Sequence, residues 1–164
     1  MENNVLINSL KNQFSISFTM LEKIIEICPD DLWNKKISGF IFWQQLIHTF
    51  SGMKGWLREE KYEGIPFSEI NGKNIYPEFE NDPEIVLVKE EVKKCFIEIK
   101  EIMYNWLNGK DDNWLKLPYK IYPKITNNDI TLGQLRHLMY HIGHCDAIFR
   151  DNKIKPEEYL DYYG

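Results

Sequence analysis

Residues 7–28 read INSLKNQFSISFTMLEKIIEIC, and their apolar side chains recur every three or four positions. The apolar positions are Ile7, Leu10, Phe14, Phe18, Leu21, Ile25 and Cys28. This spacing puts them on one face of a helix. Pro29 is expected to end the helix, because proline cannot continue the helical hydrogen-bond ladder. A stripe of this length has to be buried lengthwise against other helices, so the stretch predicts an all-α fold.

Two further stretches have helical spacing. Residues 85–106 repeat the apolar pattern of the first helix. This helix is expected to begin at the preceding residues, where Asp82 can cap it, Pro83 suits its first position and Glu84 favours its dipole. A less regular helix is predicted over residues 40–57.

The last predicted helix begins at Thr131, which has the spacing of a capping box with Gln134, and runs to about Arg150. Two long links lie between the predicted helices. Residues 61–82 are rich in Gly, Pro and Asn, and residues 109–129 form a second long link before the last helix. The first is long enough to cross one end of the helices, so that helix three runs parallel to helix two. Long links of this kind often form lids or pocket walls.

Composition limits the class of protein. The chain has 164 residues, 43% of them hydrophobic and 27% charged, which predicts one globular domain over residues 1–164. The net charge of -5, with no basic stripe, argues against a nucleic-acid partner. No signal peptide and no membrane-spanning stretch is expected. The three widely spaced cysteines suit reduced thiols in the cytoplasm. The tail PEEYLDYYG (156–164) is expected to pack on the helices or contact a partner.

Three of the four histidines fall in RHLMYHIGHCDAIFR (136–150). His137 and His141 are four apart, so on a helix their side chains project together and can hold one metal ion. A third ligand has to come from another helix, and His48 is the histidine that remains. The alternative is that the pair faces solvent or is satisfied in the core without metal.

His48 lies in FIFWQQLIHTFSG (40–52), among small or polar neighbours that are expected to leave room around it. These neighbours are Gln44, Gln45, Ser51, Gly52 and Gly55. A glycine inside a helix costs about 1 kcal/mol relative to alanine, so two of them indicate a packing or access requirement.

Three histidine ligands would leave a coordination position open, which is the arrangement of catalytic sites. His144 is then a candidate catalytic residue, a fourth ligand, or a group that contacts the substrate. Cys145 beside it is a candidate soft ligand or nucleophile, but its place near the apolar stripe favours a buried, unreactive thiol.

These features resemble the DinB-like family over nearly the whole chain. The family histidine midway along helix two is matched by His48 in FWQQLIHTFSGMKGWL, and a pattern like H-x-x-x-H-R-G-Q is matched by HLMYHIGH (137–144). His137 and His141 occupy the ligand positions. Ile142 and His144 replace the Arg and Gln that are frequent in the family, which changes the surroundings of the metal.

The resemblance implies a four-helix bundle in up-down-down-up order, frequently dimeric, with zinc or nickel as the divalent metal. It also implies relatives that are thiol-dependent S-transferases, using bacillithiol or mycothiol, or a thiol-dependent isomerase. We therefore expect a homodimeric metal-dependent transferase or hydrolase that acts on small electrophiles, with a low-molecular-weight thiol as partner. The alternative is a non-catalytic, stress-related metal-binding or interaction protein.

Overall fold

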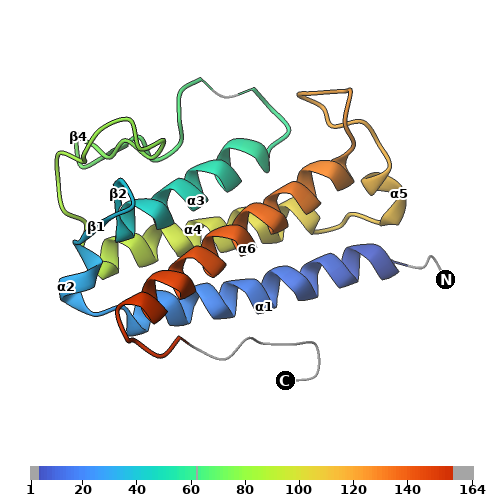
Figure 1. Cartoon of the computed structure of the whole chain (residues 1–164). Coiled ribbons are helices and arrows are strands. Elements are labelled where there is room, and N and C mark those ends of the chain that lie inside the picture. Colours follow the sequence, from blue (N-terminus) through green and yellow to red (C-terminus); the bar gives the residue numbers. More distant parts are fainter. Residues whose placement is uncertain (1–3, 62, 157–164) are drawn as a thin grey trace.

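The computed structural model describes residues 4–61 and 63–156 and is mostly helical (Figure 1). Four long helices dominate it: α1 (Val5–Ile27), α3 (Phe42–Trp56), α4 (Lys89–Leu107) and α6 (Asn127–Asp151). Two one-turn helices, α2 (Asp30–Trp33) and α5 (Asp112–Leu115), lie in the connections. The predicted all-α class is confirmed. The tail at 157–164 lies outside the described residues, so its predicted contacts stay a prediction.

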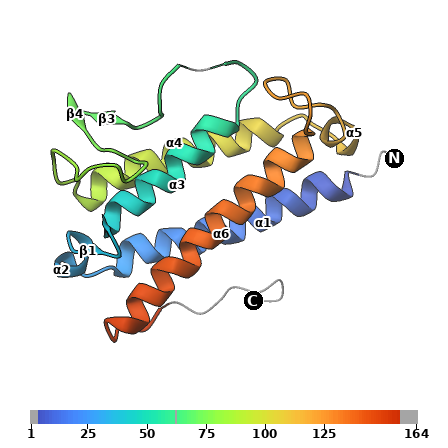
Figure 2. The same cartoon turned by 45° about the horizontal axis from the view of Figure 1, so that its top comes forward.

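The four long helices lie side by side. α1 packs against α4 and α6, and α3 packs against the same two helices. α6 therefore lies between α1 and α3, as both views show (Figure 1, Figure 2). In Figure 1, α1 and α6 run in one direction along the molecule, while α3 and α4 run in the other. The second and third long helices, α3 and α4, therefore run parallel, as the length of the link between them predicts.

The first helix follows its sequence pattern closely. Of the seven apolar stripe residues, Ile7, Leu21 and Ile25 are fully buried and the others nearly so. The helix ends at Ile27, directly before Cys28 and Pro29, which confirms the predicted end. α1 packs against both α4 and α6, and all seven side chains of its stripe belong to the hydrophobic core.

The predicted start of α4 at Asp82-Pro83-Glu84 is wrong, since the helix begins only at Lys89. Glu84 is held by a loop instead: its backbone N–H donates to the Asn74 carbonyl (2.9 Å), and its carboxylate accepts from the Asn74 N–H (3.0 Å). At the true start, the Glu91 carboxylate accepts from the Val88 N–H at 3.0 Å.

The predicted start of α6 is also wrong by one turn. The cap is Thr126, whose side chain accepts from the Asp129 N–H (3.2 Å), while the Asp129 carboxylate accepts from the Thr126 N–H (2.8 Å). Thr131 lies buried inside the helix. Its hydroxyl donates to the Asn127 carbonyl and accepts from the indole of Trp106.

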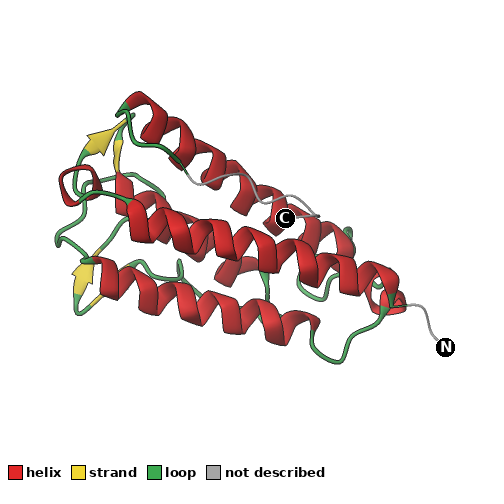
Figure 3. Ribbon diagram, turned by 90° about the horizontal axis from the view of Figure 1, so that it is seen from below, coloured by secondary structure: helices red, strands yellow, loops and turns green. Residues whose placement is uncertain are grey.

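The strands are short additions at the end of the molecule where α3 and α4 begin (Figure 3). β1 (Lys36–Ile37) pairs antiparallel with β2 (Phe40–Ile41) just before α3. β3 (Glu69–Ile70) pairs antiparallel with β4 (Lys73–Asn74) within the long link between α3 and α4. β2 takes the first two residues of the predicted second helix, so α3 begins at Phe42.

No helix within the described ranges, 4–61 and 63–156, has both the length and the hydropathy of a membrane span.

Candidate metal centre

His48 lies midway along α3 and is oriented by a backbone carbonyl from the long link. Its Nδ1 is 2.8 Å from the Pro77 carbonyl oxygen. Because a carbonyl can only accept, Nδ1 carries the proton and donates. The lone pair of the neutral ring is then on Nε2. Histidines that bind metals have the same arrangement, in which the second ring nitrogen donates to a protein acceptor.

His137 and His141 come from α6, one helical turn apart. The Nε2 of His137 is 3.1 Å from the Nε2 of His141 and 3.3 Å from the Nε2 of His48. The structure thus brings together the three histidines that the sequence predicts as ligands. One nitrogen from each ring lies within 4.8 Å of those from the other two.

These separations fit a metal ion. With Zn–N bonds of 2.0–2.1 Å, two imidazole nitrogens on one ion are about 2.9 to 3.4 Å apart, depending on the bond angle. The two nitrogen–nitrogen distances to His137 fall in this range. The Nδ1 of His141 is buried and has no hydrogen-bond partner among the described residues, so this ring lacks the support that the Pro77 carbonyl gives to His48.

Burial keeps two of these rings neutral. Desolvation, followed by the neighbouring His48, lowers the pKa of His137 to about 4. Desolvation, followed by His137, His48 and His144, lowers the pKa of His141 to about 3. Both imidazoles are therefore unprotonated near pH 7, which is the form that binds metal.

The close approach of His137 explains why position 52, inside α3, is a glycine. A Cβ built on Gly52 would lie 2.6 Å from the Cε1 of His137, so the ring of His137 occupies the space that any side chain there would need. Gly55 is less crowded, since its Cβ would meet the Pro66 ring at 3.8 Å. The space predicted beside His48 is thus filled by another ligand of the same site.

The polar neighbours of His48 do not leave room. Gln44 and Gln45 are 1% and 0% exposed. The Gln44 amide donates to carbonyls of the long link, and the Gln45 amide nitrogen is 2.9 Å from the Sγ of Cys145. The interpretation of these two residues as small or open surroundings is therefore wrong. Nothing in the sequence marks Pro77, because a backbone carbonyl carries no residue signal.

Four rings that are at least partly exposed form a chain from His48 to His141, which we term the aromatic collar. In order, its members are Phe79, Phe40, His144 and Tyr140. Successive ring centres along this chain are 4.6 to 6.4 Å apart. The predicted catalytic residue His144 belongs to this collar, and the group of three possible ligands found in the described part of the chain does not include it. Its catalytic role stays a prediction.

The cysteines are buried and unbridged. Cys145 is 0% exposed, and burial, its largest cause, raises the pKa of its thiol far above the ordinary value. The same cause raises the pKa of Cys28 to about 12 and that of Cys95 to about 11. A thiol held protonated in this way is a poor nucleophile and ligand, in agreement with the prediction for Cys145.

A cavity of about 200 Å³ has Gly52 and Glu78 among its walls, and none of the three histidines lines it. Gly52 lies against the ring of His137, and the Glu78 carboxylate is 3.8 Å from the Nδ1 of His48. Its remaining walls are Ser51, Gly55, Trp56, Arg58, Gly64, Ile65 and Pro66. Two of its wall residues, Gly52 and Glu78, thus contact or approach two of the proposed ligands, His137 and His48.

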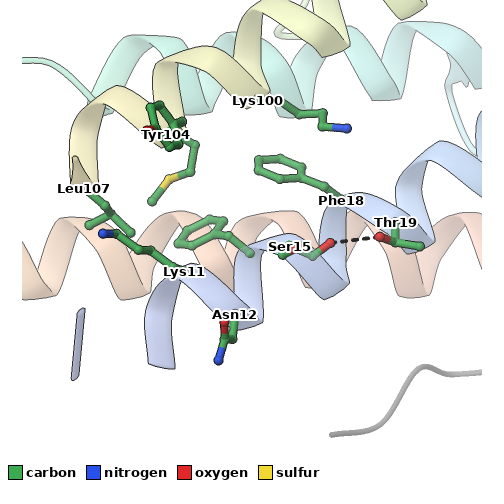
Figure 4. Close-up of a pocket in the computed structure, with 10 residues that line it drawn as sticks. Lys11, Asn12, Ser15, Phe18, Thr19, Lys100, Tyr104 and Leu107 are labelled. Atoms are coloured by element: carbon green, nitrogen blue, oxygen red, sulfur yellow. Dashed lines mark hydrogen bonds between the residues drawn. The ribbon is translucent and has the colours of Figure 1, made fainter. Parts of the chain in front are cut away.

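A separate cavity of about 390 Å³ lies between α1 and α4 and has no wall from α3 or α6 (Figure 4). Phe14, Phe18 and Met103 are among its apolar walls, and Lys11 and Lys100 lie at opposite ends in this view. It is not connected to the histidine cluster by any shared residue.

Comparison with known proteins identifies no relative. No family model matches the chain, no curated protein matches it, and no solved structure matches it.

Proposed function

We propose that this chain is a divalent-metal-binding protein of the DinB-like kind, with an up-down-down-up four-helix bundle that holds zinc or nickel through His48, His137 and His141. The observation that carries this proposal is the convergence of three Nε2 atoms from two helices, with separations of 3.1 and 3.3 Å to His137. The hydrogen bond from His48 to Pro77 and the space at Gly52 support it, because each serves the geometry of the cluster.

We further propose that the site is catalytic, as a thiol-dependent S-transferase or a hydrolase acting on small electrophiles. A divalent ion bound there would supply Lewis-acid chemistry, and three protein ligands leave a position for an exogenous group. The cavity beside Gly52 would hold the substrate. His144, part of the aromatic collar and only partly buried, would accept or donate a proton during the reaction.

Metal content tests the binding proposal. Protein purified without a histidine tag should contain one zinc or nickel ion per chain after equilibration and dialysis. His48→Ala and His141→Ala should each lose it, while the matched control His144→Ala should keep it. Wild-type protein that takes up no metal, with unchanged stability in its presence, would overturn the proposal.

Turnover tests the catalytic part separately. Metal-loaded protein should consume a model electrophile only with an added low-molecular-weight thiol if it is an S-transferase, or an ester without thiol if it is a hydrolase. In either case His144→Ala should slow the reaction without loss of metal. Stoichiometric metal with no turnover for any thiol or ester substrate would instead favour a non-catalytic, stress-related binding protein.

Oligomeric state and location are part of the same proposal. The family resemblance favours a homodimer, which light scattering after size-exclusion chromatography measures directly. The three free, buried cysteines support a reducing compartment such as the cytoplasm.

A further inference from the structure

A single side chain, Gln44, holds the segment of the long link that contacts His48. Its Nε2 is 2.8 Å from the Tyr76 carbonyl, 3.1 Å from the Ile75 carbonyl and 3.1 Å from the Asn81 carbonyl. A carboxamide nitrogen has two N–H groups, so three carbonyls share two donors. These carbonyls flank residues 77–80 on both sides, so Gln44 closes that short stretch into a loop against α3.

The orientation of the Gln44 amide follows from its partners. Carbonyl oxygens can only accept, so the nitrogen has to face the loop. The Oε1 then accepts from the Ile41 N–H at the start of α3, at 3.3 Å. The side chain is 1% exposed, so water does not compete for these contacts. Gln44 thereby ties the loop to the first turn of the helix that carries His48.

The loop delivers two contacts to His48, which follows Gln44 by one helical turn on the same face of α3. The Pro77 carbonyl accepts from its Nδ1 at 2.8 Å. The Phe79 ring lies against its imidazole, with ring centres 4.6 Å apart. Both contacts come from between the carbonyls that Gln44 holds, so the position of Gln44 controls both.

The backbone of this loop would not keep its shape unaided. Tyr76 and Phe79 have φ angles of 52° and 64°, in the left-handed region that residues with a side chain seldom adopt. Such conformations persist only where surrounding contacts enforce them. The hydrogen bond from Gln44 to the Tyr76 carbonyl acts on one of these two residues directly.

We propose that Gln44 is the positioning residue of the metal site: its buried amide holds the 75–81 loop so that the Pro77 carbonyl fixes His48 with Nε2 directed toward His137 and His141. This inference rests on the proposed metal-binding function. In this arrangement Gln44, on one turn of α3, holds the loop, and the loop in turn orients His48, the third ligand, on the next turn of the same helix.

The test compares two adjacent buried glutamines. Gln44→Met removes the amide that holds the loop, and Gln45→Met removes an equally buried amide that contacts Cys145 instead. Zn²⁺ affinity is measured by competition with a chromophoric chelator, and the His48 tautomer by imidazole ¹⁵N chemical shifts in metal-free protein. Thermal unfolding of each variant separates these readouts from loss of fold.

Gln44→Met should lower Zn²⁺ affinity about 10- to 100-fold, as loss of a supporting hydrogen bond does at metal sites. It should also abolish the preference of His48 for the Nδ1–H tautomer, which a merely structural role would not change. Gln45→Met should alter neither. If Gln44→Met does not fold, Gln44→Asn keeps a buried amide but withdraws it from the loop, and it should lower the affinity in the same direction.

Wild-type affinity and tautomer in a folded Gln44 variant would overturn the inference and leave the metal site intact. Equal losses in the Gln44 and Gln45 variants would also overturn it. Absence of both Zn²⁺ and Ni²⁺ binding by the wild-type protein would instead refute the proposed function, and the His48 tautomer would then still decide whether Gln44 positions the ring.

Discussion

His137 and His141 are carried by a single helix, whereas His48 is oriented by a helix and a loop together. On α6 the i,i+4 spacing alone sets the two rings side by side, with their Nε2 atoms 3.1 Å apart. On α3 the ring of His48 depends on the Pro77 carbonyl, which lies 29 residues further along the chain. The first arrangement is local and is written in the sequence, while the second exists only after the long link has folded onto α3.

The largest loss of metal-dependent stability should come from removing one ligand from α3 or one from α6. His48→Ala leaves a pair fixed by one helix, whereas His141→Ala leaves a pair that spans two helices and depends on the loop. We expect both variants to lose most of the metal-dependent stabilisation, which is about 4 kcal/mol for wild type at a metal concentration 1,000 times Kd.

Thermal unfolding with and without Zn²⁺ measures this difference. His48→Ala should keep more residual Zn²⁺ affinity than His141→Ala, because its remaining pair is preorganised. The reverse order would show that the α3 side of the site, and not the α6 pair, provides the rigid part.

Acid should destabilise the metal-free protein through the α6 pair. The pKa values of His137 and His141 are lowered to about 4 and about 3, from 6.5 in an exposed ring. Between about pH 6.5 and pH 4 the unfolded chain therefore binds protons that the folded chain does not, and the free energy of unfolding falls as the pH falls. The slope is at most about 1.4 kcal/mol per pH unit for each imidazole.

Urea unfolding at several pH values checks this slope. The double variant H137Q/H141Q should have a flatter profile in the same window, because it lacks both groups. A profile as steep as that of wild type would mean that other groups cause the acid sensitivity.

Gly52→Ala should disturb the contact between α3 and the His137 ring of α6. Its Cβ would lie 2.6 Å from the His137 ring, so the ring has to move, at a cost of about 1–3 kcal/mol in the free energy of unfolding and with loss of metal affinity. Gly55→Ala is the matched control on the same helix, because its Cβ meets only the Pro66 ring at 3.8 Å.

Gly55→Ala should stabilise the protein by up to about 1 kcal/mol, since alanine favours helix more than glycine does. Chemical denaturation and chelator competition measure both variants. Equal behaviour of the two glycine variants would contradict the close approach of His137 to α3.

The smallest effect on the site should come from Thr126→Ala at the start of α6. Loss of the cap should lower the free energy of unfolding by about 1 kcal/mol. Metal affinity should stay unchanged, because His137 lies three turns further along the helix. A loss of affinity would show that the α6 pair is less independent of its surroundings than its spacing implies.

The sequence predicted what depends on local periodicity. The stripe of α1, its end before Pro29 and the positions of His137 and His141 all follow from residues close together in the chain. Helix starts were predicted less well, because similar capping signals occur at several positions. Asp82-Pro83-Glu84 resembles a helix start, but Glu84 gains two hydrogen bonds to Asn74 across a loop.

Contacts with distant residues limit the prediction of both the helix starts and the site. Thr131 and Gln134 match a capping box, yet the hydroxyl of Thr131 is used within the core by Trp106. Gln44 was visible as a polar neighbour of His48, but its role depends on carbonyls of residues 75, 76 and 81, and carbonyls are the same in every residue. Contacts that join a side chain to a distant backbone leave no pattern in the sequence.

X-ray absorption at the zinc edge of metal-loaded protein tests the central claim most directly. The proposed site predicts three imidazole nitrogens at about 2.0–2.1 Å from the ion in the wild-type protein, and no bound zinc in dialysed His141→Ala. A spectrum without histidine scattering, or one that is unchanged in His141→Ala, would contradict a metal centre built from His48, His137 and His141.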